Sequence, residues 1–460
     1  MNRAVGTFCD LPDGRTVRVG TVSFSSNEGG VLISTAFRYA DTWLSEPAGY
    51  DLSPELPRGL GARIASGERV IPGAIADTGP DRWGQNLLYA AERRDARREG
   101  RRTRPLNASD FILMARDETR EGALRFSDDG GESFLSAGRG DVPALVDLGD
   151  LVAAGRRQSR DRGTDSDLEL LTRAGTSMGG ARPKVTVRTD SGRLALAKLP
   201  SAEDSWDVQG WEATALELAR RAGVSVPEFS LHRLDVDSSV LVVDRFDRQA
   251  DGRRVGYMSA HSMVEKVDNT AVSYVELADI LGLHSAEPKT DRRELFRRIA
   301  FSLLINNVDD HMKNHGFLRA TGGWRLSPVF DINPFPSGRL VDSTAISFRG
   351  SGTNRDVNEL IDQAGYFGLT GDEAVEIVVE VEVATRDWVD VAAAFGVEDP
   401  EDGVVATAFD TRERDQARAL ASSAVIAADV GAAGKGSPQG WVRPYLRNGR
   451  VVKGHQRRSR

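Results

Sequence analysis

A short polar segment that directly follows an apolar helical run constrains this chain more than any other feature. Apolar residues recur at helical spacing over 295–304, and "NVDDHMKNHGF" follows at 307–317. This segment holds two carboxylates, two histidines, a lysine and two amides within eleven residues. The stretch "GFLRATGGWRLSP" predicts a β-hairpin, and Asp331 follows it. The chain therefore carries a polar loop between a buried helix and a hairpin, with a further carboxylate beyond.

The spacing of these groups favours phosphoryl transfer. Asn314 follows Asp309 by five residues, and Asp331 follows Asp309 by 22. Protein kinases use a carboxylate, an amide and a second carboxylate in this order, the first to orient the substrate hydroxyl and the others to hold Mg²⁺ on the ATP phosphates. We therefore predict Asp309 as the catalytic base, with Asn314 and Asp331 as metal ligands. Lys313 would add positive charge near the transferred phosphoryl group.

The two histidines of the segment allow a different chemistry, a metal pair. His311 and His315 stand four residues apart and would share one face of a helix. The zinc-protease signature has Glu directly after its first histidine, where this chain has Met312, and Gly316 argues against a continuous helix. A metal-dependent hydrolase is therefore a weaker alternative, beside a purely structural polar turn. Asp310 and His311 keep both interpretations, and we expect at least one of them to be structural.

A kinase also needs a phosphate-binding loop upstream of its catalytic base. The stretch "GTSMGGARPK" at 175–184 suits this role, because its glycines let the backbone approach phosphates and Lys184 adds a positive charge. No Ser or Thr follows Lys184, so this is not a Walker loop, and Pro183 removes one N–H donor. Read alone, the stretch is equally typical of a plain turn.

A strand lysine and a hinge complete the kinase pattern. Lys198 lies in "RLALAKLP", an apolar strand where a lysine needs a phosphate or carboxylate partner unless it reaches solvent. Glu212, at the start of the next predicted helix, is a possible partner, although a first-turn acid also stabilises a helix. "VVDRFDR" at 242–248 would join two lobes, with Asp244 and Phe246 near the adenine.

The order of predicted elements indicates an α+β fold in three parts. The first 40 residues predict a strand meander, and we assign a β-rich subdomain to residues 1–145. The sequence loosens into Gly, Ser, Asp and Arg over 126–168, which places the boundary near residue 145. A small α+β lobe with glycine-rich loop and hinge would occupy 146–270. Helical patterning then predicts a mainly helical lobe with a basic tail over 271–460.

Composition limits the class of protein. The 460 residues exceed the length of a single core, and a net charge of −8 argues against nucleic-acid binding by the whole chain. Cys9 is the one cysteine, which excludes an internal disulfide and fits the cytoplasm, and no apolar run predicts a membrane span. Two arginine-rich runs, 92–104 and 441–460, predict solvated surfaces or, alternatively, docking surfaces.

Seven motifs in register resemble one known family, the HipA-type serine/threonine kinases, which are toxins of bacterial toxin–antitoxin pairs. They cover nearly the whole chain in the family's order and at similar separations: "PDRWGQNLL", "EGALRF", "GGARPK", "AKLP", "DRFDR", "NVDDHMKNHGFL" and "LSPVFDINP". The resemblance implies a two-lobed protein-kinase-like core with an extra N-terminal subdomain, and ATP with Mg²⁺ as cofactors. It also implies Asp309 as the base and Asn314 with Asp331 at the metal.

The resemblance further implies nucleotide contacts, a partner and a target. The contacts would be Gly179, Gly180, Ala181, Arg182, Lys184, Lys198, Asp244, Phe246, His311, Lys313 and Asn314. The hinge acid is often Glu in the family, and Asp244 has a shorter side chain with which to reach the adenine. The partner would be a helix-turn-helix antitoxin similar to HipB, with operator DNA reached only through it. An aminoacyl-tRNA synthetase would be the target, Ser177 the inactivating autophosphorylation site, and a catalytically silent interaction module the rival class.

Overall fold

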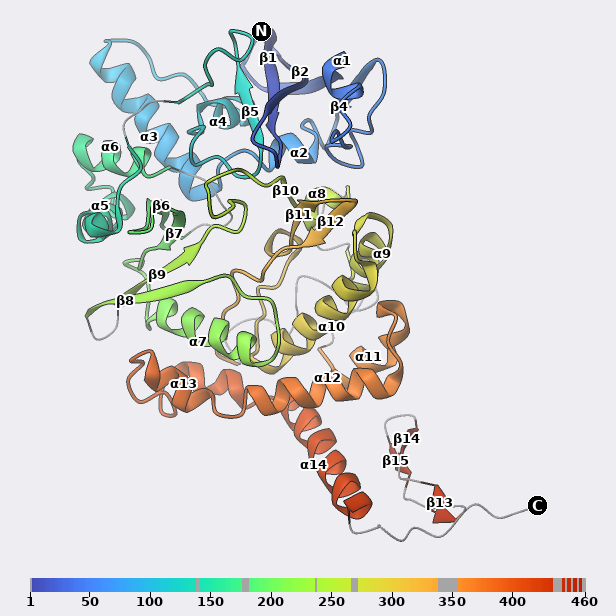
Figure 1. The fold of residues 1–460 in the computed structure, drawn as a ribbon. Helices are drawn as coiled ribbons and strands as arrows, with labels where there is room; N and C mark the ends of the chain where they lie inside the picture. Colours follow the sequence, from blue (N-terminus) through green and yellow to red (C-terminus); the bar gives the residue numbers. More distant parts are fainter. Residues whose placement is uncertain are drawn as a thin grey trace.

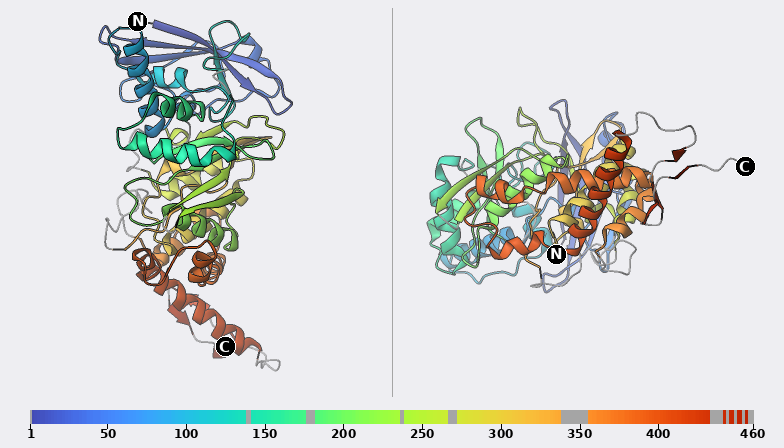
Figure 2. Two further views of the ribbon diagram at one scale, coloured as in Figure 1. Left: turned by 90° about the vertical axis from the view of Figure 1, so that its left-hand side faces the viewer. Right: turned by 90° about the horizontal axis from the view of Figure 1, so that it is seen from below.

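The computed structural model of the chain describes residues 2–137, 141–175, 182–235, 238–265, 272–337, 355–432, 441–442, 445–447, 450–452 and 455–456. Figure 1 shows a β-rich subdomain at the N-terminal end, a small sheet below it, and a helical lobe that ends in a protruding helix. The views in Figure 2 show these parts stacked along one long axis. This arrangement confirms the predicted α+β fold. None of the described helices is both long and apolar enough to cross a bilayer.

The N-terminal subdomain is built on a five-stranded antiparallel sheet in the order β4-β3-β2-β1-β5. Its strands are β1 (Asn2–Asp10), β2 (Thr16–Ser26), β3 (Leu32–Tyr39), β4 (Ala62–Ser66) and β5 (Leu124–Ser127). Gly14 and Gly30 hold the left-handed conformations that the two tight connections require, so the predicted meander is confirmed. Its helices are α1 (Asp41–Leu44), α2 (Gly73–Ala76), α3 (Arg82–Arg98) and α4 (Ala108–Met114).

The small lobe contains an antiparallel sheet in the order β6-β7-β9-β8. Its elements are α5 (Leu148–Ser159), α6 (Asp165–Arg173), β6 (Lys184–Arg188), β7 (Leu194–Lys198), α7 (Val208–Arg221), β8 (Phe229–Asp235) and β9 (Ser238–Asp244). The Asp207 side chain caps α7 by accepting from the Gly210 N–H at 3.0 Å, which fixes where this helix begins. The predicted strands and helix of this lobe are confirmed.

The C-terminal lobe surrounds the buried helix α10 (Pro288–Leu304), which begins with a proline in its first turn. The predicted hairpin is confirmed as β11 (Gly316–Ala320) and β12 (Gly323–Leu326), joined by β10 (Tyr257–Ser259) in a three-stranded sheet. The other helices are α8 (Ala260–Met263), α9 (Tyr274–His284), α11 (Val357–Asp362), α12 (Gly371–Ala384), α13 (Trp388–Ala394) and α14 (Arg412–Ala432). Thr370 and Glu373 form a capping box at the start of α12.

Several short elements complete the chain. They are the 3₁₀ turns η1 (Leu145–Asp147), η3 (Met312–Asn314), η4 (Ala364–Phe367) and η5 (Val404–Phe409), and the tail strands β13 (Trp441–Val442), β14 (Tyr445–Arg447), β15 (Arg450–Val452) and β16 (His455–Gln456). The arginine-rich run 92–104 covers the end of α3 and the residues after it. Arg101 pairs there with Glu92 at 2.5 Å and Arg104 with Asp110 at 2.8 Å, so part of its charge is neutralised.

The structure differs from the sequence-based interpretation between residues 126 and 168. This stretch was predicted to be a loose connection, but α5 and the beginning of α6 occupy its second half. Leu151 of α5 and Leu171 of α6 pack in one buried cluster with Leu87 of α3 and Val187 of β6. Segments on both sides of residue 145 therefore share a core, which the polar composition of the stretch concealed.

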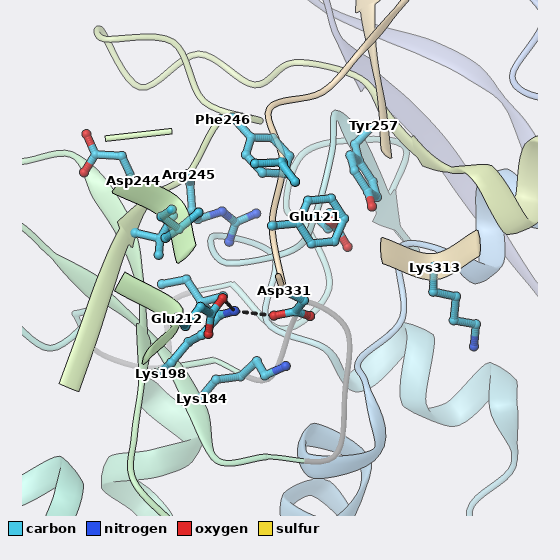
Figure 3. Close-up of a pocket in the computed structure, with 15 residues that line it drawn as sticks. Glu121, Lys184, Lys198, Glu212, Asp244, Arg245, Phe246, Tyr257, Lys313 and Asp331 are labelled. Atoms are coloured by element: carbon cyan, nitrogen blue, oxygen red, sulfur yellow. Dashed lines mark hydrogen bonds and ion pairs between the residues drawn. The ribbon is translucent and has the colours of Figure 1, made fainter. Parts of the chain in front are cut away.

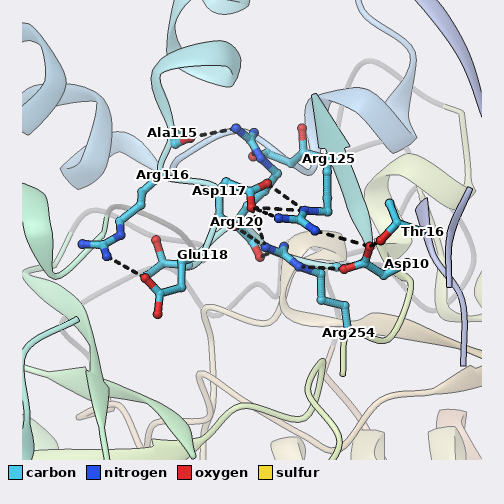
Figure 4. A network of polar contacts seen from close by, with 12 residues as sticks. Asp10, Thr16, Ala115, Arg116, Asp117, Glu118, Arg120, Arg125 and Arg254 are labelled. Carbon is cyan, nitrogen blue, oxygen red and sulfur yellow. Dashed lines mark hydrogen bonds and ion pairs between the residues drawn. The ribbon is translucent and has the colours of Figure 1, made fainter. Parts of the chain in front are cut away.

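Buried ion pairs join the N-terminal subdomain to the chain that follows β9 (Figure 4). Asp117 accepts from Arg125 at 2.5 Å and from Arg254 at 3.2 Å, and Arg254 also lies 3.3 Å from Asp10. Arg120 is fully buried and donates to the Ala115 carbonyl at 2.7 Å. Removing one charge from such a network leaves others buried without compensation, so the network holds the subdomain in a fixed position.

Candidate functional site

A pocket lies where the small lobe, the chain after β9 and the C-terminal lobe meet. Figure 3 shows Lys198, Glu212 and Asp331 meeting inside it, whereas the Asp244 side chain points away. The lining residues are Glu121, Lys184, Leu196, Lys198, Glu212, Leu216, Val243, Asp244, Arg245, Phe246, Tyr257, Lys313, Val329, Phe330 and Asp331.

Lys198 is the centre of an ion-pair triad in this cavity. Its Nζ donates both to Glu212 of α7, the partner considered from the sequence, and to Asp331 of the C-terminal lobe (Figure 3). Burial would lower the pKa of Lys198, but the two carboxylates outweigh it and raise this pKa. Burial likewise opposes ionisation of Asp331, and Lys198 with Lys184 overcomes it, lowering the Asp331 pKa to about 2. The lysine therefore links the two lobes as a fully charged group.

The backbone at Asp331 is held in an uncommon conformation. Its φ is +52°, a left-handed value that costs energy for a residue other than glycine. The residue sits just after Val329 and Phe330, which also line the cavity. This conformation directs the carboxylate to Lys198, and such local strain is typical of functional positions.

Asp309 lies beside this triad and is exposed. Neighbouring protein atoms still desolvate its carboxyl in part and raise its pKa, the His311 imidazole opposes this, and the negative charge of Asp331 adds to it. The Asn314 side chain donates through Nδ2 to the Asp309 carbonyl oxygen at 2.9 Å, which ties the two predicted residues together. Asn314 therefore directs its amide oxygen away from this bond. Neither Asp309, His311 nor Asn314 lines the cavity itself, whereas Lys313 does.

Asp310 is a structural residue. Its carboxylate is buried and accepts from the Tyr274 hydroxyl at 2.6 Å and pairs with His315 Nε2 at 2.8 Å. Burial alone would raise the pKa of Asp310, but His315 and these hydrogen bonds lower it. Asp310 is thus the structural residue that we expected among Asp310 and His311. The contact also removes support for a metal pair, because His315 is bound to Asp310 and only a short 3₁₀ turn, not an α-helix, lies between His311 and His315.

Lys184 reaches the same site from β6. It is buried and lies 3.7 Å from Asp81, the N-cap residue of α3 in the N-terminal subdomain. Burial raises the pKa of Asp81 to about 6, against the opposing charge of Lys184. Arg182 is instead exposed and pairs with Asp204 at 2.5 Å, away from the cavity. Ser177, Gly179, Gly180 and Ala181, which were predicted to form the loop and its phosphorylation site, lie outside the described residues.

The predicted hinge forms one wall of the cavity. Phe246 packs against Phe330 and Tyr257, with ring centroids 5.6 Å and 6.2 Å away, so three aromatic residues meet there. The Asp244 side chain pairs with Arg193 at 2.6 Å, and its backbone N–H donates to the Glu228 carbonyl. The shorter hinge acid is thus engaged by the neighbouring strand turn rather than turned freely into the cavity.

Sequence reasoning missed Glu121, Asp81 and Tyr257. Two of them lie in motifs that were recognised only as part of the family pattern, "PDRWGQNLL" and "EGALRF". The missed signal was an acid in each of these two motifs, Asp81 and Glu121, for which no role was predicted. Glu121 lines the cavity and Asp81 lies against Lys184 because of how the N-terminal subdomain packs on the small lobe, and spacing along the chain does not report this packing.

The fold and the site together define a two-lobed, protein-kinase-like protein with an added N-terminal subdomain. Residues 176–389 match the family described as HipA-like C-terminal domain. A solved structure described as the toxin–antitoxin complex of HipA, HipB and operator DNA from Shewanella oneidensis shares the fold, with a TM-score of 0.61 and 15% identity over 91% of this chain and 97% of that chain. Residues 176–389 are therefore similar to this family, and the fold that the stated resemblance implied is confirmed.

Two curated relatives match the chain over shorter stretches. A protein named "Putative kinase" from Haemophilus influenzae is 27% identical over 165 residues, which are 32% of this chain and 48% of that protein. A protein of the same description from Sinorhizobium fredii is 29% identical over 170 residues, 33% of this chain and 40% of that protein. The chain thus spans less than half the length of these relatives.

Proposed function

We propose that this protein is a serine/threonine protein kinase that transfers the γ-phosphoryl group of ATP with Mg²⁺. The observation that carries the proposal is the Lys198 triad, because it joins a strand lysine, a helix glutamate and the acid after the hairpin at one cavity. Protein kinases require a lysine–glutamate pair and a metal-binding acid in this relation. The relatives named as kinases and the shared fold support the same reaction.

The residues of the site suit Mg²⁺ and nucleotide. Asp331 and the Asn314 amide offer hard oxygen donors. Desolvation is the main cause of the raised Asp309 pKa, and the nearby charge of Asp331, which adds to it, is one that a cation would relieve. Mg²⁺ would neutralise the phosphate oxygens during transfer. In this account Lys198 keeps Glu212 and exchanges its bond to Asp331 for a phosphate oxygen when nucleotide enters.

Asp309 would orient the hydroxyl of the acceptor protein and take its proton. Its raised pKa improves it as a base, because a carboxylate in a partly desolvated, acidic environment holds a proton more readily. Lys313 and Lys184 would balance the charge of the phosphates from opposite sides of the cavity. Phe246 and the chain around Asp244 would receive the adenine.

We further propose that the kinase is the toxin of a toxin–antitoxin pair in the cytoplasm. Its partner would be a helix-turn-helix antitoxin similar to HipB, which binds operator DNA, as the complex from Shewanella oneidensis suggests by its components. Its target would be an aminoacyl-tRNA synthetase, whose modification stops translation. Phosphorylation of Ser177 by the kinase itself would switch it off, because about −1.5 to −2 added charges beside the ATP phosphates repel them.

Radiolabelled ATP added to a cell lysate with the purified protein tests this function. We expect label on a small set of proteins, identified by mass spectrometry, that requires Mg²⁺. A catalytically silent interaction module would leave the lysate unlabelled above the background without added protein. Intact masses of wild type and Ser177→Ala after incubation with Mg-ATP test the autophosphorylation. The same gain of one phosphate in both proteins would contradict it.

A further inference from the structure

The Glu121 side chain lines the cavity although it belongs to the N-terminal subdomain. It lies beside Phe246 and Tyr257 in Figure 3, at the aromatic end of the cavity. Only 8% of the residue is exposed, and the phosphate-facing groups Lys184 and Lys198 lie toward the other end (Figure 3). An acidic residue is unexpected at this end, because flat, apolar side chains are sufficient to hold a nucleobase.

The backbone around Glu121 is fixed by the chain after β9. Arg245 donates to the carbonyl oxygens of Thr119 and Arg120 at 2.5 Å and 3.2 Å. The Gly122 N–H donates to the buried Asp247 carboxylate at 2.8 Å. Gly122 has a φ of +71°, and a Cβ there would lie 3.1 Å from the Tyr257 nitrogen, so the turn requires glycine. These bonds determine the direction in which Glu121 points.

The Glu121 carboxyl has no hydrogen-bond or ion-pair partner among the described residues. The nearby Arg245 guanidinium is already bound to Asp247 at 2.6 Å and 2.9 Å. Burial raises the pKa of Glu121 well above its ordinary value, and the Asp247 charge adds to this effect. Burial next to Phe246 and Tyr257 favours the protonated form of this carboxyl, which offers one O–H donor next to one C=O acceptor.

We propose that Glu121 makes the cavity selective for adenine over guanine nucleotides by hydrogen-bonding to the adenine ring. Adenine carries a ring nitrogen that accepts next to an amino group that donates, which complements a neutral acid in both positions. On the edge that carries N7, where adenine offers N7 and its amino group, guanine presents two acceptors, N7 and O6, so the acid C=O would face the guanine oxygen without a hydrogen bond. This inference rests on the proposed nucleotide binding and adds a specificity residue from the N-terminal subdomain.

A purely structural role for Glu121 predicts different behaviour. A buried acid without a partner costs free energy, so replacing it by an apolar residue of similar size should leave the fold intact or more stable. Selectivity between nucleotides would then stay unchanged. A role in base recognition predicts the opposite pattern, with unchanged folding and altered selectivity.

The test is calorimetric titration of the full chain with Mg-ATP and Mg-GTP, for wild type, Glu121→Met and Glu121→Gln. Wild type should prefer ATP. Glu121→Met should bind ATP about tenfold more weakly with little change for GTP, because it loses both hydrogen bonds. Glu121→Gln should keep ATP affinity within about threefold, because its amide still donates and accepts. Melting temperatures check folding, and Glu121→Val replaces the Met variant if that variant does not fold.

The outcomes separate this inference from the proposed function. An unchanged ratio of ATP to GTP affinity in Glu121→Met, with ATP bound by wild type, overturns the role of Glu121 alone. Equal weakening of both nucleotides does the same, because it points to ribose or phosphate rather than base. Wild type that binds neither nucleotide overturns both proposals.

Discussion

Single residues at the site show two different uses of buried charge. Asp331 and Lys198 meet at the cavity, where ligand can replace one partner, whereas Asp310 is enclosed by Tyr274 and His315. The sequence predicted a metal role for Asp331 and left the role of Asp310 open. Only the three-dimensional surroundings separate the acid that can bind a ligand from the acid that holds the loop.

Asp331→Ala should weaken Mg-ATP binding by tenfold or more, because a predicted metal ligand is lost. Lys198 would keep Glu212 as its partner, so the fold should persist. Calorimetric titration with and without Mg²⁺ measures the effect. An unchanged Mg²⁺ dependence in the variant would count against a metal role for Asp331.

Asp310→Asn should destabilise the protein at neutral pH by about 1–3 kcal/mol. The neutral Asn side chain has one acceptor oxygen, whereas both oxygens of the Asp310 carboxylate are engaged, one by Tyr274 and one by His315. The folded pKa of Asp310 is depressed, so its contribution is complete above the unfolded value near about 4 and is lost as pH falls through the folded pKa. Urea unfolding at pH 7 and at about pH 3, below the unfolded pKa, measures this. A stability difference between wild type and variant that grows toward acidic pH would refute the assignment.

At the scale of elements, the chain after β9 acts as a clamp on the segment 116–122. Asp247 is fully buried between Arg245 and Arg248, and both arginines also bind backbone carbonyls of that segment. Burial would raise the pKa of Asp247, but the two arginines hold it well below its ordinary value. The "DRFDR" motif therefore attaches the N-terminal subdomain in addition to lining the cavity.

Asp247→Ala should destabilise the protein by about 3–5 kcal/mol, because two arginines would remain buried without their common partner. Asp251→Ala is the matched control, since the exposed Asp251 pairs, among the described residues, only with Arg253 in the same loop and should change stability by less than about 0.5 kcal/mol. Chemical denaturation measures both. Similar stabilities for the two variants would contradict the clamp.

Sequence patterns predicted some elements and missed others for physical reasons. The hairpin β11–β12, the α12 capping box and the Lys198–Glu212 pair follow local rules, so they were predictable. Helices α5 and α6 were missed because glycines, serines and arginines dilute their apolar faces. Glu121 reaches the cavity, and Asp81 reaches Lys184, only through packing between distant segments, which no local pattern encodes.

At the scale of the whole molecule, buried clusters among the described residues pack segments from different parts of the chain together. One cluster unites α3 of the N-terminal subdomain with α5, α6 and the small-lobe sheet, and its Leu87 is fully buried. The small lobe therefore completes its core with a helix from the first hundred residues. We infer that the subdomain and the small lobe unfold together.

Leu87→Ala should lower stability by about 2–5 kcal/mol and keep one cooperative transition in both fluorescence and circular dichroism. Leu283→Ala is the control, because Leu283 is 79% exposed on α9 and should change little. Two separate transitions, with only the first shifted in Leu87→Ala, would show that the subdomain unfolds independently.

The central claim is that Asp309 is the base of a phosphoryl-transfer site. The most direct measurement compares label transferred from γ-labelled Mg-ATP to lysate proteins by wild type and by Asp309→Asn, with ATP affinity measured in parallel. Loss of the base should reduce transfer by about 10²–10⁴-fold while ATP binding stays within a few-fold of wild type. Transfer at the wild-type rate by a variant that still binds ATP would contradict the account.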